Sequence, residues 1–371
     1  SFNVSRLTLY RLLYYITKKA FYSFLIVFGV VSLIFLLFNM IPGDPARMVM
    51  GQRTDSASLA AARHDLGLDK PLGYQYLKYL NDFSPISIHN PRNPDSYIYL
   101  DKTLYTGAIS LISFGKSRVL VLKFPYLRRS YQSKKTVTSI VGETLPNTFI
   151  LALTSMIFAT IVGIFLGIIA AIKKDSIFDK SALIFSAFGM SLPSFFAAIL
   201  VGWIFAFLLG KYTGLNLTGN LWVVDDFGEG IHLQLKNLIL PTLTLGLRPL
   251  SIITQLTRSS MLETLSQDYI RTAKAKGLKF STIIRKHALK NSLNPVVTAV
   301  SGWFASLMTG VIFVEYIFGW KGLGYVMVNA LNSYDVPLVI GCVVSLSLIF
   351  VVINLLVDIL YSILDPRVKF S

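Results

Sequence analysis

Six long apolar stretches dominate this chain of 371 residues. A helix needs about 20 mostly apolar residues to cross the hydrocarbon core of a membrane, because each residue advances it by about 1.5 Å. Five of the stretches contain no charged residue, and the sixth contains only Arg248. The sequence therefore predicts an all-α integral membrane protein with six transmembrane helices, at residues 20–41, 144–172, 181–210, 237–257, 291–314 and 336–357.

The first stretch follows basic residues, as the apolar part of a signal peptide does. At about 22 residues it is longer than the apolar region of a signal peptide, which has roughly 7–15 residues. The segment Ile-Pro-Gly-Asp-Pro follows it in place of a small-residue cleavage site. We therefore expect a retained first span.

The charge pattern separates two explanations of the net charge of +16. Such basicity is typical of nucleic-acid-binding proteins, but also of membrane proteins whose cytoplasmic loops are rich in Lys and Arg. Residues 258–290 carry eight Lys or Arg against two acidic residues, whereas residues 211–236 carry two against three. This alternation predicts that both termini are cytoplasmic and that the chain binds a lipid membrane and no nucleic acid.

The segment 42–143 between the first two spans is predicted to be an extracytoplasmic loop, since long loops are translocated largely regardless of their charge. Residues 56–66 are typical of a short helix that Gly67 ends, and Asp69 is expected to cap a second helix. Two runs rich in β-branched and aromatic residues, 97–100 and 119–124, leave room for a small β element.

The cytoplasmic loop after the fourth span is too polar for lipid and has helix-forming residues. We expect a helix at 261–276, with cations in its last turn, where the helix dipole is negative. Gly277 is a helix-stop residue, and a second helix is expected at 282–290 before Asn294-Pro295. A helix, turn and helix joined to a span can occupy a groove of a soluble partner and move that span.

Several motifs in register resemble one family. They are Ile-Pro-Gly-Asp-Pro at 41–45, Leu-Gly-Leu-Asp-Lys-Pro at 66–71, Leu-Pro-Asn-Thr at 145–148, Asp-Tyr-Ile-Arg-Thr-Ala-Lys-Ala-Lys-Gly-Leu at 268–278, Arg-Lys-His-Ala-Leu-Lys-Asn-Ser-Leu-Asn-Pro at 285–295, Gly-Val-Ile-Phe-Val-Glu at 310–315, Gly-Leu-Gly at 322–324, Asn-Leu-Leu-Val-Asp at 354–358 and Leu-Asp-Pro-Arg at 364–367. Together they resemble the permease subunits of binding-protein-dependent ABC importers. More narrowly, they resemble the B-type permease of dipeptide, oligopeptide and nickel systems. The general signature of these permeases begins Glu-Ala-Ala, where this chain has Arg271-Thr272-Ala273, as the peptide branch does.

The resemblance implies the fold of a type I importer permease. Residues 1–41 would be the cytoplasmic segment and first span, 42–143 the outer loop, and 144–371 the permease core, with an ATPase-coupling loop at 259–294. The chain would bind no cofactor itself and pair in a bacterial inner membrane with a second permease. Two ATPase subunits holding ATP-Mg and an extracytoplasmic solute-binding protein would complete the importer. The resemblance places in the coupling loop Asp268, Tyr269, Arg271, Ala273, Lys274, Ala275, Gly277, Arg285, His287 and Asn291.

Transport would then proceed inward by alternating access. A channel or secondary transporter that needs no ATPase is the alternative from another class. It predicts ion-coupling acids inside the spans, and the six stretches contain none. The substrate stays open among dipeptides, oligopeptides, nickel and other solutes, and so does the role of residues 84–130. Our hypothesis is that the strand-like runs form a small cap that docks the binding protein.

Two charged residues near or inside the spans are candidates for the pore or its gate. Arg248 either faces the pore and attracts a carboxylate, or snorkels, or pairs with an acid such as Glu315. Glu315 either pairs with Lys321 or Arg248, or forms part of a gate. The residues alone do not separate these alternatives.

No catalytic or metal site is predicted. The four histidines are scattered without ligand spacing. The segment Phe-Gly-Lys-Ser at 114–117 lacks the first glycine of a P-loop, because Ser110 stands in its place. We therefore expect a protein that is not an enzyme.

Overall fold

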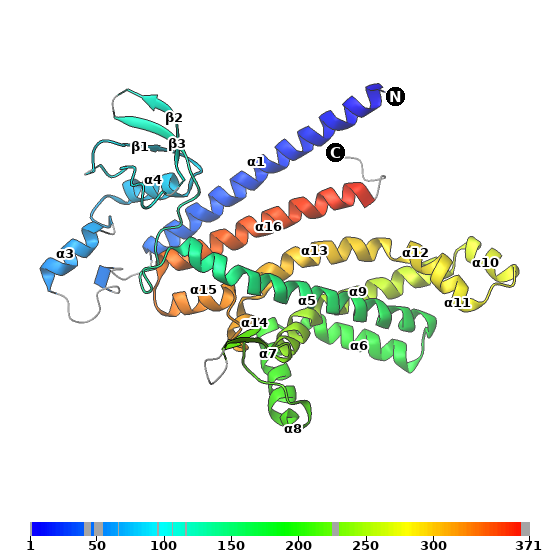
Figure 1. Ribbon diagram of the computed structural model, residues 1–371. Coiled ribbons are helices and arrows are strands. Elements are labelled where there is room, and N and C mark those ends of the chain that lie inside the picture. Colours follow the sequence, from blue (N-terminus) through cyan, green and yellow to red (C-terminus); the bar gives the residue numbers. More distant parts are fainter. Residues whose placement is uncertain are drawn as a thin grey trace. The chain divides into compact units, whose positions relative to one another are not determined.

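The computed structural model describes residues 2–40, 46–47, 55–65, 67–94, 96–105, 107–115, 117–224 and 230–364, and it is mostly helical (Figure 1). The chain forms two compact units. The large unit comprises Ser1–Ser23, Thr144–Val326 and Leu346–Ser371, and the small unit comprises Phe24–Glu143 and Met327–Ser345. Both units are discontinuous in sequence, whereas the predicted domains are continuous ranges.

The large unit is built around one long helix, α9 (Lys236–Leu265), which packs against α6, α7 and α13. Its apolar core includes Leu151, Leu240, Ile253 and Met308. In chain order its elements are α5 (Val137–Ile172), α6 (Ile177–Ser191), α7 (Ser194–Gly202), the π-helix η1 (Trp203–Leu208), α8 (Gly210–Thr213), β4 (Trp222–Val224), β5 (Ile231–Leu233), α9, α10 (Asp268–Ala275), α11 (Phe280–Thr282), the π-helix η2 (Ile283–Ala288), α12 (Leu289–Ser292), α13 (Asn294–Gly310), α14 (Ile312–Ile317), the start of α15 (Leu323–Asn332) and the end of α16 (Val336–Leu364).

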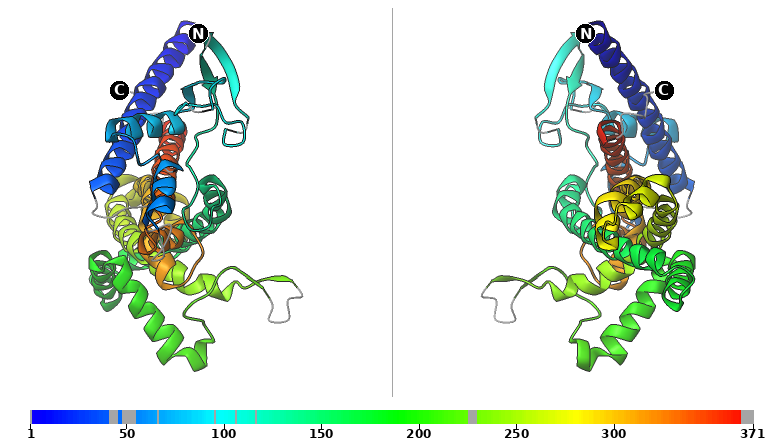
Figure 2. Two further views of the ribbon diagram at one scale, coloured as in Figure 1. Left: turned by 90° about the vertical axis from the view of Figure 1, so that its left-hand side faces the viewer. Right: turned by 90° about the vertical axis from the view of Figure 1, so that its right-hand side faces the viewer.

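The small unit contains a three-stranded antiparallel sheet of order β1-β3-β2. Its strands belong to the cyan part of the ribbon in Figure 2. Its strands are β1 (Ile86–His89), β2 (Ile109–Phe114) and β3 (Arg118–Leu122). An apolar cluster joins the later part of α1 (Phe2–Met40) to α4 (Leu72–Phe83) and the start of α16, and a short helix, α3 (Ser56–Asp65), precedes α4. Phe114 is the last residue of β2, and Gly115 turns after it with φ +64°.

Four helices are long and apolar enough to cross a membrane, counted over the described residues. They overlap the spans predicted at 20–41, 144–172, 237–257 and 336–357, and these helices are confirmed. The candidate spans within these helices are Thr17–Leu37 of α1, Val137–Ile172 of α5, Lys236–Leu265 of α9 and Val336–Val357 of α16.

The other two predicted spans differ from expectation. Residues 181–210 are not one helix, because α6 and α7 meet at a bend of 115°. Pro193 causes the break, since it forces the preceding Leu192 out of helical geometry, to ψ 126°. Helix α13 has 17 residues and stops at Gly310, short of the length that a straight span needs. The six-span arrangement stays a prediction.

Two predictions for the segment 42–143 are confirmed and two are wrong. Helix α3 is followed by Gly67 in left-handed geometry (φ +69°), and β3 falls in the run 119–124. Asp69 does not cap α4, because Pro71 occupies the N-cap and Asp69 pairs with Lys70 at 3.1 Å. The run 97–100 contributes only an isolated bridge from Tyr99 to Asn90. The motif at 41–45 lies outside the described residues.

A buried ion pair joins α6 to α9. The Asp179 side chain is 1% exposed, and its carboxylate accepts hydrogen bonds from both Nε and Nη2 of Arg258, the latter at 2.7 Å. It also accepts from the backbone N–H of Asp175 at 2.9 Å, which closes the turn before α6. The sequence gives no local signal of this pair, because its two residues lie 79 positions apart.

We expect Asp179→Asn to lower the free energy of unfolding by about 3 kcal/mol, since it leaves a partly buried guanidinium without its counter-charge. Thermal unfolding of the purified protein in mild detergent measures this. Asp175→Asn is the matched control, because Asp175 is exposed and asparagine tolerates its left-handed backbone. Equal unfolding temperatures for the two variants would contradict a stabilising role of the pair.

Candidate functional site

The loop between α9 and α13 has a sharper architecture than predicted. Helix α9 runs on to Leu265, and a break at Ser266–Gln267 separates it from α10. The helix predicted at 261–276 is therefore two helices, because Gln267 has an extended backbone with ψ 151°. Gly277 makes the turn after α10 with φ +73°, as the sequence indicated.

Apolar burial anchors this loop to the rest of the large unit. Ile270 is fully buried and Ala273 is 6% exposed, and both pack in a cluster with Met261 of α9, Ala171 of α5 and Ile283 of η2. Ala273 therefore points into the chain and is not a surface residue. Each buried aliphatic side chain stabilises the folded state by roughly 1.5–3 kcal/mol, so α10 is held as part of the helical core.

A polar contact ties the two arms of the loop together. Asn291 of α12 donates from Nδ2 to the hydroxyl oxygen of Tyr269 in α10 at 2.9 Å. The second arm, predicted as one helix at 282–290, is the continuous sequence of α11, η2 and α12, with a π-helical turn in its middle. Displacing α10 would therefore also displace the arm that leads into α13.

The outward side of the loop is charged at its edges. Eight of the ten predicted coupling residues are exposed: Asp268, Tyr269, Arg271, Lys274, Ala275, Gly277, Arg285 and Asn291. His287 is half-buried. Sequence reasoning missed two large apolar side chains beside them, Leu278 and Phe280, which are 40% and 48% exposed. Their signal was two apolar residues flanking Lys279 directly after the helix stop, where a purely solvated turn would be polar.

Glu315 is fully buried and does not pair with a cation. Its Oε2 accepts hydrogen bonds from the backbone N–H groups of Gly324 and Tyr325 at 2.7 and 3.2 Å, in the first turn of α15. Among the described residues neither Lys321 nor Arg248 pairs with it, so those alternatives are wrong. A side chain at position 322 would collide with the Glu315 carboxylate, so this position requires glycine.

Three of the sequence motifs meet beside Glu315. Trp320 donates from Nε1 to the carbonyl of Asn147 at 3.0 Å, and Asn147 donates from Nδ2 to the carbonyl of Lys321 at 2.8 Å. The N–H of Leu323 donates to Oγ1 of Thr148 at 2.8 Å. The turn between α14 and α15 is thereby fastened to α5, and residues 145–148, 310–315 and 322–324 form one structure.

Arg248 is exposed on α9, and its guanidinium lies 5.8 Å from the centroid of the Trp303 ring of α13. Within the described part of the chain, no carboxylate forms an ion pair with it. The predicted pairing of Arg248 with an acid to fix helix packing therefore finds no partner among these described residues.

The small unit holds a cluster of cations around one buried carboxylate, Asp82. Lys78 lies 3.1 Å from it, Tyr105 donates to it at 2.6 Å, and Arg128 lies 3.8 Å from it. Lys123 donates to the Asp82 carbonyl at 2.5 Å, and burial lowers the pKa of this lysine to about 8. The cluster fixes α4 to the sheet.

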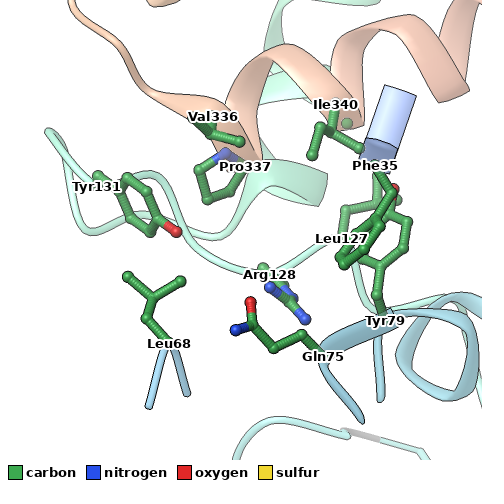
Figure 3. A pocket seen from close by; sticks show the side chains of 11 residues that line it. Phe35, Leu68, Gln75, Tyr79, Leu127, Arg128, Tyr131, Val336, Pro337 and Ile340 are labelled. Atoms are coloured by element: carbon green, nitrogen blue, oxygen red, sulfur yellow. The ribbon is translucent and has the colours of Figure 1, made fainter. Parts of the chain in front are cut away.

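Figure 3 shows a small pocket beside this cluster, lined by apolar side chains and by Arg128, Gln75 and Tyr131. Its volume is about 50 Å³, room for a water molecule but not for a peptide. Over the residues that the structure describes, no group of three or more His, Cys, Asp or Glu is placed to hold a metal ion.

Comparison with known proteins gives consistent matches. Residues 163–370 match the family described as the binding-protein-dependent transport system inner membrane component, and residues 12–88 match the N-terminal family of the same membrane components. A di/tripeptide transport system permease protein of Pseudomonas aeruginosa is 31% identical over 358 residues, covering 92% of this chain and 94% of its own. A glutathione transport system permease protein of Pectobacterium atrosepticum is 31% identical over 349 residues, with coverages of 92% and 94%.

Among solved structures, an amino acid ABC transporter chain is 12% identical, with a TM-score of 0.46, covering 62% of this chain and 95% of its own. The family match extends over more than half of the chain, and relatives above 30% identity align along nearly all of it. The chain therefore belongs to the family of inner membrane components of binding-protein-dependent transport systems.

Proposed function

We propose that this chain is the permease subunit of an ATP-driven importer that carries peptides or a related small solute inward. In this proposal it has six spans and cytoplasmic termini. It works with a second permease, two ATPase subunits that bind ATP-Mg and an extracytoplasmic binding protein. The relatives named for di/tripeptide and glutathione transport support a peptide-like cargo.

The anchored loop around α10 carries the proposal. A permease without its own ATPase must be moved by a partner subunit. The segment that the partner binds must be rigid, so that it moves together with the helices to which it is attached. Helix α10 meets that need, because Ile270 and Ala273 fix it to α9 and the Tyr269–Asn291 contact fixes it to α12. The exposed side of the loop carries charged residues together with the apolar side chains of Leu278 and Phe280. A polar rim around an apolar centre is typical of protein interfaces.

We expect Arg271→Glu to reduce recovery of the ATPase subunit in pull-downs by about tenfold or more, since reversing a charge in an interface sets like charges together. Lys174→Glu is the matched control, because Lys174 is an exposed cation of the short α5–α6 turn. Mass spectrometry of the complex purified in mild detergent measures the recovery. Retention of the ATPase by the Arg271 variant would contradict docking at α10, and absence of any ATPase from the wild-type complex would favour an ATPase-independent transporter.

The second part of the proposal concerns Glu315, which we assign to the outer gate. Its carboxylate holds the first turn of α15, while Trp320 and Leu323 hold the same turn to α5. A gate of this kind opens and closes as one piece, because its segments are bound to each other by short hydrogen bonds.

Glu315→Ala should lower the free energy of unfolding by about 2 kcal/mol, because it leaves two buried N–H groups unpaired. Glu315→Gln keeps an acceptor oxygen for both groups and should stay close to the wild type. Thermal unfolding together with substrate uptake in proteoliposomes distinguishes the variants. If both lost uptake equally while staying folded, the negative charge itself would be required and capping would not be the role of this residue.

The sheet of the small unit is assigned to docking of the binding protein. The strand register places Ile86, Leu122 and Ile109 in one row and Ile88, Leu120 and Ile112 in the next. Most of these side chains are more than 40% exposed, so one face of the sheet is an apolar surface that none of the described residues covers. Surfaces of this kind mark sites of protein or membrane contact.

Ile112→Lys should abolish most of the stimulation of ATPase activity by the binding protein, while the basal activity of the complex stays unchanged. Ser113→Lys adds the same charge on the other face of the same strand and is the control. Deleting residues 88–124 would be a less specific test, because it also removes the buried side chains of Val121 and Tyr105. Full stimulation of the Ile112 variant would contradict docking on this face.

A further inference from the structure

Arg248 is a charged residue in the interior of a helix that is apolar enough to cross a membrane. A cation at such a position is costly in hydrocarbon, so it normally faces water or an acidic partner. Two buried acids of the large unit are engaged elsewhere. Asp179 pairs with Arg258, and Glu315 accepts from the backbone of α15. Arg248 is exposed and lies against the ring of Trp303.

The surface next to Trp303 is polar. Along α13, at steps of three or four residues, the exposed positions form one face: Asn294, Thr298, Gly302, Ser306 and Thr309. The structure describes every residue of α13, and Val297 is the one large apolar side chain exposed on it. A side chain added at Gly302 would meet nothing within 4 Å, so this face is open.

Helix α5 offers the contrast within the same unit. Its exposed positions at the same spacing are all large and apolar: Phe149, Leu153, Ile157, Ile161 and Phe165. Such a face suits lipid chains, whereas the guanidinium of Arg248 and the amide of Asn294 do not. The hydroxyl groups of Thr298 and Thr309 donate to carbonyls of their own helix. The exposed face of α5 is therefore suited to contact with lipid, and the exposed face of α13 with Arg248 is suited to contact with water.

We propose that Arg248 attracts a carboxylate group of the cargo in a water-filled passage along the polar face of α13. Peptides carry such a group at their C-terminus, and a guanidinium can bind it in a bidentate manner. The Trp303 ring supports the guanidinium from one side through a cation–π contact. This inference rests on the proposed function for the identity of the cargo, but its two physical elements, water access and attraction of anions, can be measured without any cargo.

Cysteine labelling of the purified complex tests both elements. The chain has one cysteine, Cys342, which is buried, and Cys342→Ala provides the background. Ser306→Cys then places a thiol one turn from Trp303, and Ile157→Cys is the matched control on the apolar face of α5. The probes are two methanethiosulfonates of similar size, the anionic sulfonatoethyl reagent and the cationic trimethylammonioethyl reagent.

The thiol at position 306 should react with both probes, and the thiol at position 157 with neither. The rate ratio of the anionic to the cationic probe should fall about fivefold when Arg248→Gln is added, as expected for removal of a unit charge at short range in an aqueous setting. Arg248→Lys should retain the ratio of the parent. An unreactive thiol at 306, covered by lipid or by an acidic face of a second permease, would overturn the inference, and so would a ratio that does not respond to Arg248→Gln.

The same preparations separate this inference from the proposed function. Co-purification of the ATPase and its stimulation by the binding protein report on the importer. If these are present and the charge preference is absent, only the role of Arg248 fails. If the charge preference is present and no ATPase co-purifies, the passage stands and the importer assignment fails.

Discussion

Hydrocarbon offers no hydrogen-bond partner to a peptide group, and the large unit of this protein follows from that constraint. Every backbone N–H and C=O that enters the membrane must be satisfied within the chain, which leaves helices as the economical solution for segments such as α5, α9 and α16. Breaks are tolerated where other groups supply the missing partners. At the turn between α14 and α15, the Glu315 carboxylate and the Thr148 hydroxyl serve N–H groups that no helix satisfies.

The same constraint explains where charge is buried. Asp179 and Arg258 neutralise each other at the junction of α6 and α9, and Glu315 is compensated by N–H groups at the start of α15, where the helix dipole is positive. Arg248 differs from these residues, because no described carboxylate of the large unit pairs with it and the ring of Trp303 lies beside it. A charge without a counter-charge would be unfavourable in a close-packed core. It is compatible with the water-filled passage that we propose.

The proposed function requires that a displacement of α10 is transmitted over the length of a helix. Helix α10 is short, with eight residues, and would be unstable alone. Burial of Ile270 against α9 gives it the rigidity of the core. Because α12 leads directly into α13, a push on α10 reaches the polar face of α13 through packed side chains and one hydrogen bond, from Asn291 to Tyr269. The proposed coupling loop and the proposed passage are thus consecutive parts of one segment.

The sequence by itself determined four long apolar helices, the turn at Gly277, the position of β3 and the family, because these depend on local composition, on glycine's freedom at positive φ, or on motifs read in order. It did not determine the break at Pro193, since proline is also common inside membrane helices, nor the strands β1 and β2, whose short apolar runs are ambiguous. Only the tertiary structure decided which charges meet. The Asp179–Arg258 pair and the hydrogen bonds of Glu315 to α15 form because helix packing brings these groups together. No sequence pattern indicates either contact. The tertiary structure also decided that Ala273 points inward while Leu278 and Phe280 point outward, because exposure is a property of the packed fold.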